Sequence, residues 1–245
     1  MKVVIIDQAR MTSTRLPGKV LKPVLGKPLL EYQIERLRRV KRADDVVIAT
    51  TTNASDDILV DFCRRHGVKV YRGSELDVLS RYYGAAVEAE ADVVVRVTSD
   101  CPVIDPAVVD QVIGHYLAHQ KEYDYVSNTQ VRSFPRGMDA EVFSFGALES
   151  AYREGQLEYE REHVTPFLYG HPERFRIGQW VFREDRGDDR WTVDTPEDFE
   201  LIRRIIEDLF PVKPEFTLED ILDLLAMHPD WRQINAHVTQ KKLGE

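Results

Sequence analysis

The sequence lacks the features that mark several protein classes. Its 245 residues include only two cysteines, Cys63 and Cys101, with no CxxC pair and no clustered histidines. A disulfide framework or a structural zinc site is therefore not expected. We expect a reducing, cytoplasmic location instead. The apolar run Val3–Ile6 stops at Asp7, too early for the core of a signal peptide. No stretch approaches the roughly 20 apolar residues of a membrane-spanning helix, so no membrane segment is expected.

Positive charge is also scarce. The chain has 42 acidic residues against 33 lysines and arginines, which gives a formal net charge of −9 and a pI near 5.4. Sequence-independent binding of nucleic acid requires a basic face that displaces counterions, so we exclude a nucleic-acid partner. A small phosphate-bearing ligand is still compatible with this charge, because a local basic cluster can lie within an acidic protein.

Short β-branched runs alternate with helical patterns through the first half of the chain. The expected strands are 3–6, 46–49, 69–71 and 93–97, and the expected helices are 28–40, 55–65, 78–89 and one that begins at Pro106. Ser55 and Asp105 are the expected N-caps of the second and fourth helices. The strands are nearly continuous apolar runs, which is typical of a parallel sheet covered by helices on both faces.

The elements after residue 120 are less regular. The expected strands are 123–127, 140–143, 176–182 and 190–193, and the expected helices are about 145–154, 160–170 and 195–209. The 43% of hydrophobic residues suffices for the core of one α/β domain. We therefore predict a single domain over 1–245, with an inserted arm at about 128–175 and a helical tail at about 211–245.

The loop after the first strand carries the strongest functional signal. Five cations and no acidic residue lie between positions 10 and 27, namely Arg10, Arg15, Lys19, Lys22 and Lys27. The loop belongs to the carboxyl edge of the predicted parallel sheet, where open α/β folds bind ligands. Several cations with hydroxyl donors such as Ser13 suit the distributed charge of a polyphosphate, and a solvated basic loop is the alternative. The sequence has no Walker A or GxGxxG pattern, so ATPase-type and dinucleotide cradles are not supported.

Two aspartates, Asp100 and Asp194, directly follow other predicted strands. Both should reach the same sheet edge as the basic loop. Mg²⁺ typically takes one or two carboxylates together with substrate phosphates, so the pair is a candidate magnesium site. For Asp100 the alternative is a turn or a helix start, which Pro102 suggests. For the segment of Asp194 the alternative is a helix start capped by Thr195.

Residues 5–19 resemble the nucleotide-binding signature of the cytidylyltransferases that activate Kdo and sialic acids. Those enzymes typically carry Ala-Arg followed by Ser-Thr-Arg-Leu-Pro-Gly-Lys, which stand here at residues 9–10 and 13–19. Further similarity to the branch named for the spore coat polysaccharide biosynthesis protein SpsF lies at 73–82, 98–106, 136–143, 160–167 and 192–197. The resemblance spans about residues 1–210.

This resemblance implies a Rossmann-like nucleotide-diphospho-sugar transferase fold and a homodimer built on the inserted arm. It also implies a Mg²⁺-dependent enzyme that transfers CMP from CTP to an acidic sugar for cell-surface polysaccharide biosynthesis, with release of pyrophosphate. The implied catalytic residues are Lys19, Arg15 and Asp100, and the implied metal ligands are Asp100 and Asp194. The implied nucleotide-binding residues are Ala9, Arg10, Ser13, Arg15, Lys19 and Ser99.

The arm supplies the candidates for binding the sugar, which are Arg136, Asp139, Glu141, Arg161 and His163. The histidine is also a candidate proton acceptor for the attacking hydroxyl. The alternative is a buried ion-pair network that braces a dimer interface. Kdo-activating enzymes usually carry Gln-Gly-Asp-Glu-Pro where this chain has Thr98–Pro102, which leaves the sugar and the base open.

Two other functions fit the same features. A GT-A-like glycosyltransferase shares the sheet and the metal carboxylate, but such enzymes usually carry an Asp-x-Asp pair, and here Thr98 stands two residues before Asp100. The second alternative is a non-catalytic nucleotide-binding partner. The presence of both Lys19 and Asp100 favours an enzyme.

Overall fold

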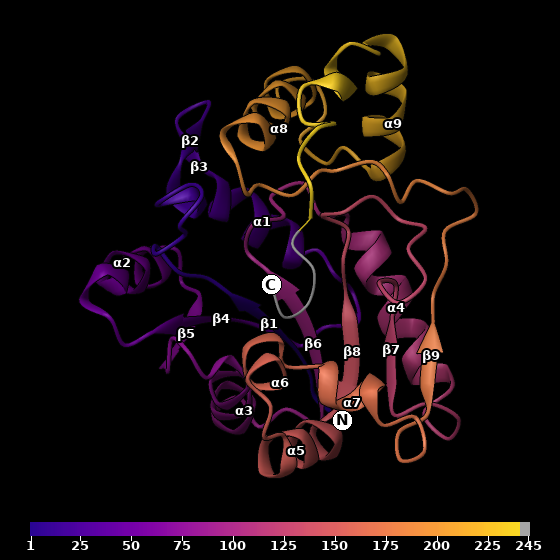
Figure 1. Cartoon of the computed structure of the whole chain (residues 1–245). Coiled ribbons are helices and arrows are strands. Elements are labelled where there is room, and N and C mark those ends of the chain that lie inside the picture. The colour runs from indigo at the N-terminus through magenta and orange to yellow at the C-terminus, as the bar shows by residue number, and fades with distance from the viewer. Residues whose placement is uncertain (241–245) are drawn as a thin grey trace.

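The computed structural model of the chain describes residues 1–240, and within them seven strands form one central sheet (Figure 1). The strands are β1 Val3–Gln8, β4 Asp45–Thr51, β5 Lys69–Gly73, β6 Val93–Thr98, β7 Tyr125–Ser127, β8 Glu141–Ser144 and β9 Ile177–Gln179. Their order in the sheet is β5-β4-β1-β6-β8-β7-β9. Within this sheet only β8 runs antiparallel to its neighbours, so the predicted, mostly parallel α/β sheet is confirmed.

The direction of β8 matters for the position of the site. Its first residue, Glu141, pairs with Arg96 near the end of β6 and with Ser127 at the end of β7. The start of β8 therefore lies at the same sheet edge as the carboxyl ends of the parallel strands. Open α/β sheets bind ligands at this edge, and the segment that precedes β8 is delivered to it.

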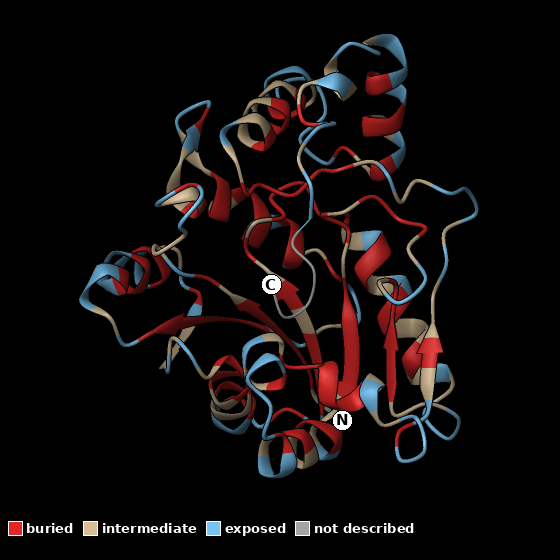
Figure 2. Cartoon of the chain, in the orientation of Figure 1, coloured by how far each residue is buried: buried red, intermediate tan, exposed pale blue. Residues whose placement is uncertain are grey.

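Helices cover both faces of the sheet, as the strand pattern predicts. They are α1 Leu29–Leu37, α2 Asp57–Arg65, α3 Val78–Glu88, α4 Pro106–Ala118, α5 Phe145–Glu154, α6 Glu158–His163 and α7 Pro166–Gly170. The residues of α3, α5 and α7 join one hydrophobic cluster, and those of α1, α2 and α4 join the clusters of the opposite face. Figure 2 shows the consequence: the central strands are buried, and the helices are buried on their inner side and exposed on the outer side.

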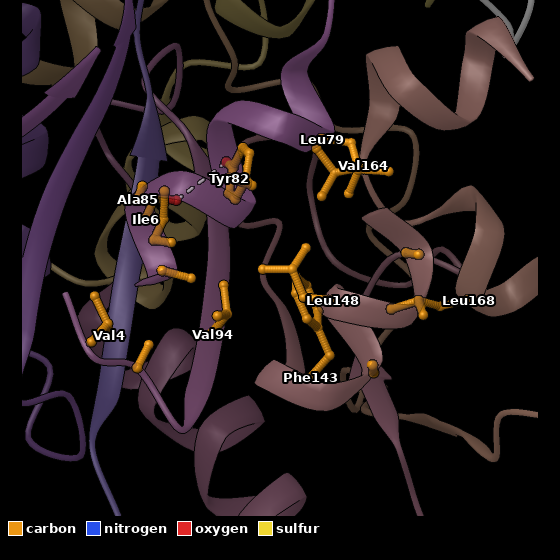
Figure 3. Close-up of a cluster of buried hydrophobic side chains, with 14 of the residues drawn as sticks. Val4, Ile6, Leu79, Tyr82, Ala85, Val94, Phe143, Leu148, Val164 and Leu168 are labelled. Atoms are coloured by element: carbon orange, nitrogen blue, oxygen red, sulfur yellow. Dashed lines mark hydrogen bonds between the residues drawn. The ribbon is translucent and has the colours of Figure 1, made fainter. Parts of the chain in front are cut away.

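The strand β1 illustrates how one sequence serves both faces. Val4 and Ile6 point to the side of α3, whereas Val3 and Ile5 point to the side of α1 and α4, because successive residues of a strand face opposite ways. Figure 3 shows the α3 side, where the hydroxyl of Tyr82 donates to the backbone oxygen of Ile6 at 3.2 Å. This bond fixes α3 against the strand whose end enters the site.

A further layer lies beyond the sheet. Helices α8 Pro196–Leu209 and α9 Leu218–Met227 pack on each other and on a cluster that includes the fully buried Trp191. The Pro-containing segment between these helices is followed by the predicted small helix, and Thr195 caps α8 as expected. A two-stranded hairpin that the sequence did not predict, β2 Pro23–Val24 and β3 Lys27–Pro28, precedes α1.

Three local predictions are wrong. Ser55 does not cap α2, because it lies inside a 3-10 turn and the preceding cap position is Asp56. The segment 190–193 forms one isolated bridge, between Arg190 and Arg136, and no strand. The helix expected over 160–170 is divided into α6 and α7 at Val164, whose φ of 73° is incompatible with a helix.

The predicted arm at 128–175 is integrated with the sheet. It supplies β8 and helices α5 to α7, and side chains of β8, α5 and α7 belong to the sheet's own hydrophobic cluster; its role in dimerisation stays a prediction. The predicted tail contains α9 and a 3-10 turn, Trp231–Gln233, and its residues 241–245 lie outside the described part. Among residues 1–240, no helix is both long and apolar enough to cross a membrane.

Candidate functional site

A cleft of about 1060 Å³ lies at the carboxyl edge of the sheet. Its walls include the end of β1 at Gln8, the end of β6 at Thr98, the segment after β7 at Thr129 and the start of β8 at Glu141. Eight lysine and arginine side chains and eight carboxylates line it. The cleft is therefore rich in charge of both signs, which suits a ligand with anionic groups and a bound cation.

Carboxylates from distant segments hold the basic loop in the cleft. Asp56 accepts a hydrogen bond from the backbone N–H of Met11 at 2.8 Å. Glu75, which follows β5, accepts from the hydroxyl of Thr12 at 2.5 Å and forms an ion pair with Arg10 at 3.5 Å. These contacts fix residues 10–12 of the loop to the segments that follow β4 and β5.

The turn at Gly18 then places the next cation. Gly18 has a φ of 67°, and its N–H donates to the backbone oxygen of Met11 at 3.0 Å. A left-handed residue here closes the loop and begins the 3-10 turn Lys19–Leu21. A glycine directly before Lys19 therefore allows the turn that places this lysine.

Lys19 lies at the centre of the candidate site. Its Nζ is 2.9 Å from Oδ2 of Asp100 and 2.8 Å from Oδ1 of Asp194. Burial opposes the charge of this lysine, but the two carboxylates outweigh that effect and raise its pKa. The structure therefore brings together the three residues that the sequence placed at the same sheet edge.

Asp100 is held as an anion by its neighbours. Burial alone would favour its neutral form, but the ammonium of Lys19 and hydrogen bonds from Lys19 and Thr98 lower the pKa of Asp100 to about 2. The Thr98 hydroxyl donates to Oδ1 at 2.7 Å. Thr98 therefore orients the carboxylate at the position where an Asp-x-Asp motif would carry a second acid.

Asp194 is surrounded by three cations. Its Oδ2 lies 2.9 Å from Nη2 of both Arg15 and Arg190, and its Oδ1 contacts Lys19. The guanidinium of Arg190 also binds both carboxylate oxygens of Asp198, at 2.9 and 3.0 Å. Asp198 is the first-turn acid that completes the predicted capping box of α8, and its contact with Arg190 connects that helix to the site.

The donor set fits Mg²⁺. One carboxylate oxygen of Asp100 and one of Asp194 both contact Lys19 Nζ. The two carboxylates therefore already hold a cation between them. No cluster of three or more His, Cys, Asp or Glu side chains suitable for a metal occurs in residues 1–240. Two carboxylates are what Mg²⁺ needs when substrate phosphates and water supply its other ligands.

The remaining predicted nucleotide-binding residues divide into two groups. Arg10, Ser13 and Ser99 line the cleft, and the Ser99 hydroxyl donates to the backbone oxygen of Gln8 at 2.7 Å. Ala9 is buried, and its N–H donates to the backbone oxygen of Ala49 at 3.1 Å. The small side chain of Ala9 packs behind the loop, and its predicted contact with the nucleotide stays a prediction.

Two cations of the basic loop lie outside the cleft. The Nζ of Lys22 lies 5.0 Å from the ring centre of Phe199, and Lys27 binds Glu35 at 2.7 Å. The five cations of the loop therefore overstate the positive charge that a ligand in the cleft meets, because only three of them, Arg10, Arg15 and Lys19, line it.

The arm provides the opposite wall of the cleft. Glu141 is buried and accepts from Tyr125 at 2.5 Å and Thr165 at 2.7 Å, and it forms an ion pair with Arg96. This is the buried network that the sequence allowed as an alternative, and it forms within one chain. Arg161 is likewise held by Asp77. The binding of sugar by Glu141 and Arg161 stays a prediction.

Arg136 differs from these paired residues. It lines the cleft, and burial followed by repulsion from Arg132 lowers its pKa. Asp139 pairs with Arg132, and no ion pair within residues 1–240 includes Arg136. His163 also lines the cleft, and burial lowers the pKa of its imidazole. Arg136, which lines the cleft and has no ion-pair partner among residues 1–240, is suited to an anionic group of a ligand.

Sequence reasoning missed the buried support behind Asp100. Gln33, fully buried on α1, donates to the backbone oxygen of Thr98 at 2.8 Å and accepts from the N–H of Cys101 at 3.0 Å. It also donates to Asp7 at 3.3 Å. Gln33 thus holds both flanks of Asp100. The available signal was a polar residue within the apolar face of a predicted helix.

Comparisons of the whole chain with known proteins give a consistent result. A family model described as Cytidylyltransferase matches residues 3–241. The chain is 34% identical to the spore coat polysaccharide biosynthesis protein SpsF of Bacillus subtilis, a match that covers 93% of this chain and 95% of that relative.

Solved structures give the same result at the level of the fold. A cytidylyltransferase from Leptospira borgpetersenii superimposes with a TM-score of 0.91 at 35% identity, over 99% of both chains. A CMP:2-keto-3-deoxy-manno-octonic acid synthetase complexed with CTP superimposes with a TM-score of 0.63 at 19% identity, over 84% of this chain and 99% of that one. The second similarity supports the Rossmann-like fold alone.

Proposed function

The chain belongs to the cytidylyltransferase family of nucleotidyltransferases, and from this premise we propose that it transfers CMP from CTP to an acidic sugar with the help of Mg²⁺. The observation that carries the proposal is the contact of Lys19 Nζ with both Asp100 and Asp194, with Arg15 on the far side of Asp194. Cell-surface polysaccharide is the expected destination of the product, since SpsF is a spore coat polysaccharide biosynthesis protein.

The cations of the basic loop would bind the triphosphate. Arg15 and Lys19 form ion pairs with carboxylates of the site, and phosphate oxygens are acceptors of the same kind. Asp100 and Asp194 would hold Mg²⁺, which neutralises negative charge on the transferring phosphoryl group when it is bound. The site therefore exchanges one set of charge pairs for another and avoids leaving buried charges unpaired.

The arm side of the cleft would bind the sugar. The structure of the synthetase complexed with CTP concerns a 2-keto-3-deoxy acid, and the sugar of the present enzyme would carry a carboxylate of the same kind. Arg136 is the cation suited to that carboxylate, since it lines the cleft and its neighbour Arg132 is already paired. The sugar hydroxyl would attack the α-phosphorus, the bond to the β-phosphate would break, and pyrophosphate would leave. His163 is the candidate acceptor for the hydroxyl proton.

The test is a matrix of substrates. Pyrophosphate release is measured with Mg²⁺ for each of the four nucleoside triphosphates against a panel of 2-keto sugar acids. We expect release with CTP and at least one acid. Transfer of sugar from a nucleotide-sugar, with no pyrophosphate release from any pair, would contradict the proposal and favour the glycosyltransferase.

Variants of the site sharpen this test. Asp100→Asn, Asp194→Asn and Lys19→Met should each lower kcat/KM by about 10²–10³-fold or more, as for other groups that stabilise charge in a transition state. Lys22→Met is the matched control, because Lys22 belongs to the same loop but packs on Phe199. Equal activity of Lys19→Met and Lys22→Met would remove Lys19 from the phosphate site.

A further inference from the structure

The last described segment of the chain returns to the cleft. After the 3-10 turn Trp231–Gln233 the backbone leaves α8 and α9 and descends toward the carboxyl ends of the strands (Figure 1). Gln240 lines the cleft together with Asp194. A segment more than 200 residues from the basic loop therefore contributes to the same wall.

Two side chains of this segment hold Arg190. The buried Asn235 donates from Nδ2 to the backbone oxygen of Arg190 at 2.9 Å and to Asp198 Oδ1 at 2.8 Å. The Oε1 of Gln240 accepts from Nη1 of Arg190 at 2.6 Å. The segment thus bonds this arginine at both its backbone and its guanidinium group.

Arg190 is placed to orient Asp194 from behind. Its Nη2 donates to Asp194 Oδ2 at 2.9 Å, while Asp198 binds Nε and Nη2 of the same group. Of the three cations on Asp194, Arg15 and Lys19 line the cleft and are the ones a phosphate would attract. Arg190, buried and bound to Asp198, is the cation that stays with the carboxylate.

Gln240 completes the support of that guanidinium group. With Nε and Nη2 bound by Asp198 and Nη1 bound by Gln240, the planar group cannot turn without breaking a hydrogen bond. Partners that orient a metal ligand in this way influence metal affinity. We propose that Gln240 is a positioning residue for the metal carboxylate Asp194, acting through Arg190, and that the segment 235–240 is a functional part of the site.

This inference rests on the proposed Mg²⁺ role of Asp194, and direct metal binding tests it. Gln240→Met keeps the length of the side chain and removes the acceptor, whereas Gln240→Glu keeps an acceptor oxygen. Gln233, exposed on the 3-10 turn, supplies the matched control Gln233→Met. The probe is Mn²⁺ in the presence of CTP, followed by electron paramagnetic resonance of the free ion.

We expect Gln240→Met to weaken Mn²⁺ binding about 3- to 10-fold, less than the 10- to 100-fold effect of losing a direct partner of a ligand. Gln240→Glu should stay within about 2-fold of wild type, and Gln233→Met should be unchanged. The urea midpoint of Gln240→Met should equal that of wild type, because its side chain is exposed at the cleft surface. A merely structural contact would lower that midpoint and leave Mn²⁺ binding unaltered.

Equal Mn²⁺ binding by wild type and Gln240→Met would overturn this inference and leave the proposed function intact. Wild-type protein that binds no Mn²⁺ with CTP would overturn both. The two failures are therefore distinguishable in one titration.

Discussion

Asp7 is a buried carboxyl group that lowers stability and contacts a residue that supports the site. It is fully buried at the end of β1, it accepts from Gln33 at 3.3 Å, and its Oδ1 has no partner within residues 1–240. Burial, followed by repulsion from Asp100, raises the pKa of Asp7 well above its usual range. Burial therefore favours the neutral form of Asp7, while Gln33 contacts both Asp7 and the backbone on either side of Asp100.

A pH dependence follows from this raised pKa. A carboxyl group with a raised folded pKa contributes stability that is fully present below its unfolded pKa of about 4 and is lost as the pH rises toward the folded value. Asp7→Asn removes that loss. Relative to wild type, its free energy of unfolding should rise by about 1.4 kcal/mol per pH unit between about pH 4 and the folded pKa of Asp7.

Urea unfolding of both proteins at a series of pH values measures this difference. Asp61→Asn is the control, because Asp61 is exposed on α2 and should give a curve parallel to wild type. Parallel curves for Asp7→Asn as well would show that Asp7 does not titrate abnormally.

At the scale of elements, the site depends on two segments that are not strands. The backbone of Arg136 accepts from Trp191 N–H at 2.7 Å, and its N–H donates to the oxygen of Asp189 at 2.9 Å. Gly137 adopts a φ of 104°, and a Cβ there would lie 2.6 Å from the backbone oxygen of Trp191. Glycine permits this close approach, which holds the segment of Arg136 beside the segment that leads to Asp194.

Gly137→Ala should therefore be costly. The strained φ and the clash with backbone atoms together predict a loss of about 3 kcal/mol in the free energy of unfolding. Gly170→Ala is the matched control, because a Cβ there has no neighbour within 4 Å, and it should change stability by less than about 0.5 kcal/mol. Denaturant unfolding of the two variants decides the point, and similar midpoints would mean that the close approach is not essential.

The same element scale explains what the sequence could predict. Asp100 and Lys19 were predictable because strand patterning is strong in β1 and β6, and parallel strands deliver their carboxyl ends to one edge. Arg190 and Gln240 were not, since their contact depends on how segments far apart in the chain dock. The position of Lys22 outside the cleft could not be predicted either, because sequence gives the charge of a side chain but not its direction within a loop.

The whole molecule separates its charge by location. The cleft has equal numbers of carboxylates and of lysine and arginine side chains, so the formal excess of −9 belongs to the rest of the chain. A nucleotide would thus be bound by a few short-range contacts, with little attraction from the surface as a whole.

Ionic strength tests this description. The dissociation constant of CTP should rise less than about 10-fold between 50 and 200 mM salt, whereas proteins that neutralise 6–10 phosphates lose about 10³–10⁵-fold. Calorimetric titration at the two salt concentrations measures the change, and duplex DNA in the same buffers should show no binding. A steep salt dependence for CTP, or retention of DNA, would contradict the separation of charge.

The long-range contacts of Lys19 also have a kinetic meaning. Its two carboxylate partners are 81 and 175 residues away along the chain, so the ion pairs that define the site close large loops. Contacts of this kind form slowly, because chain entropy must be lost before they contribute. During folding the chain can form its helices and its local strand pairs well before Lys19, Asp100 and Asp194 come together in the site.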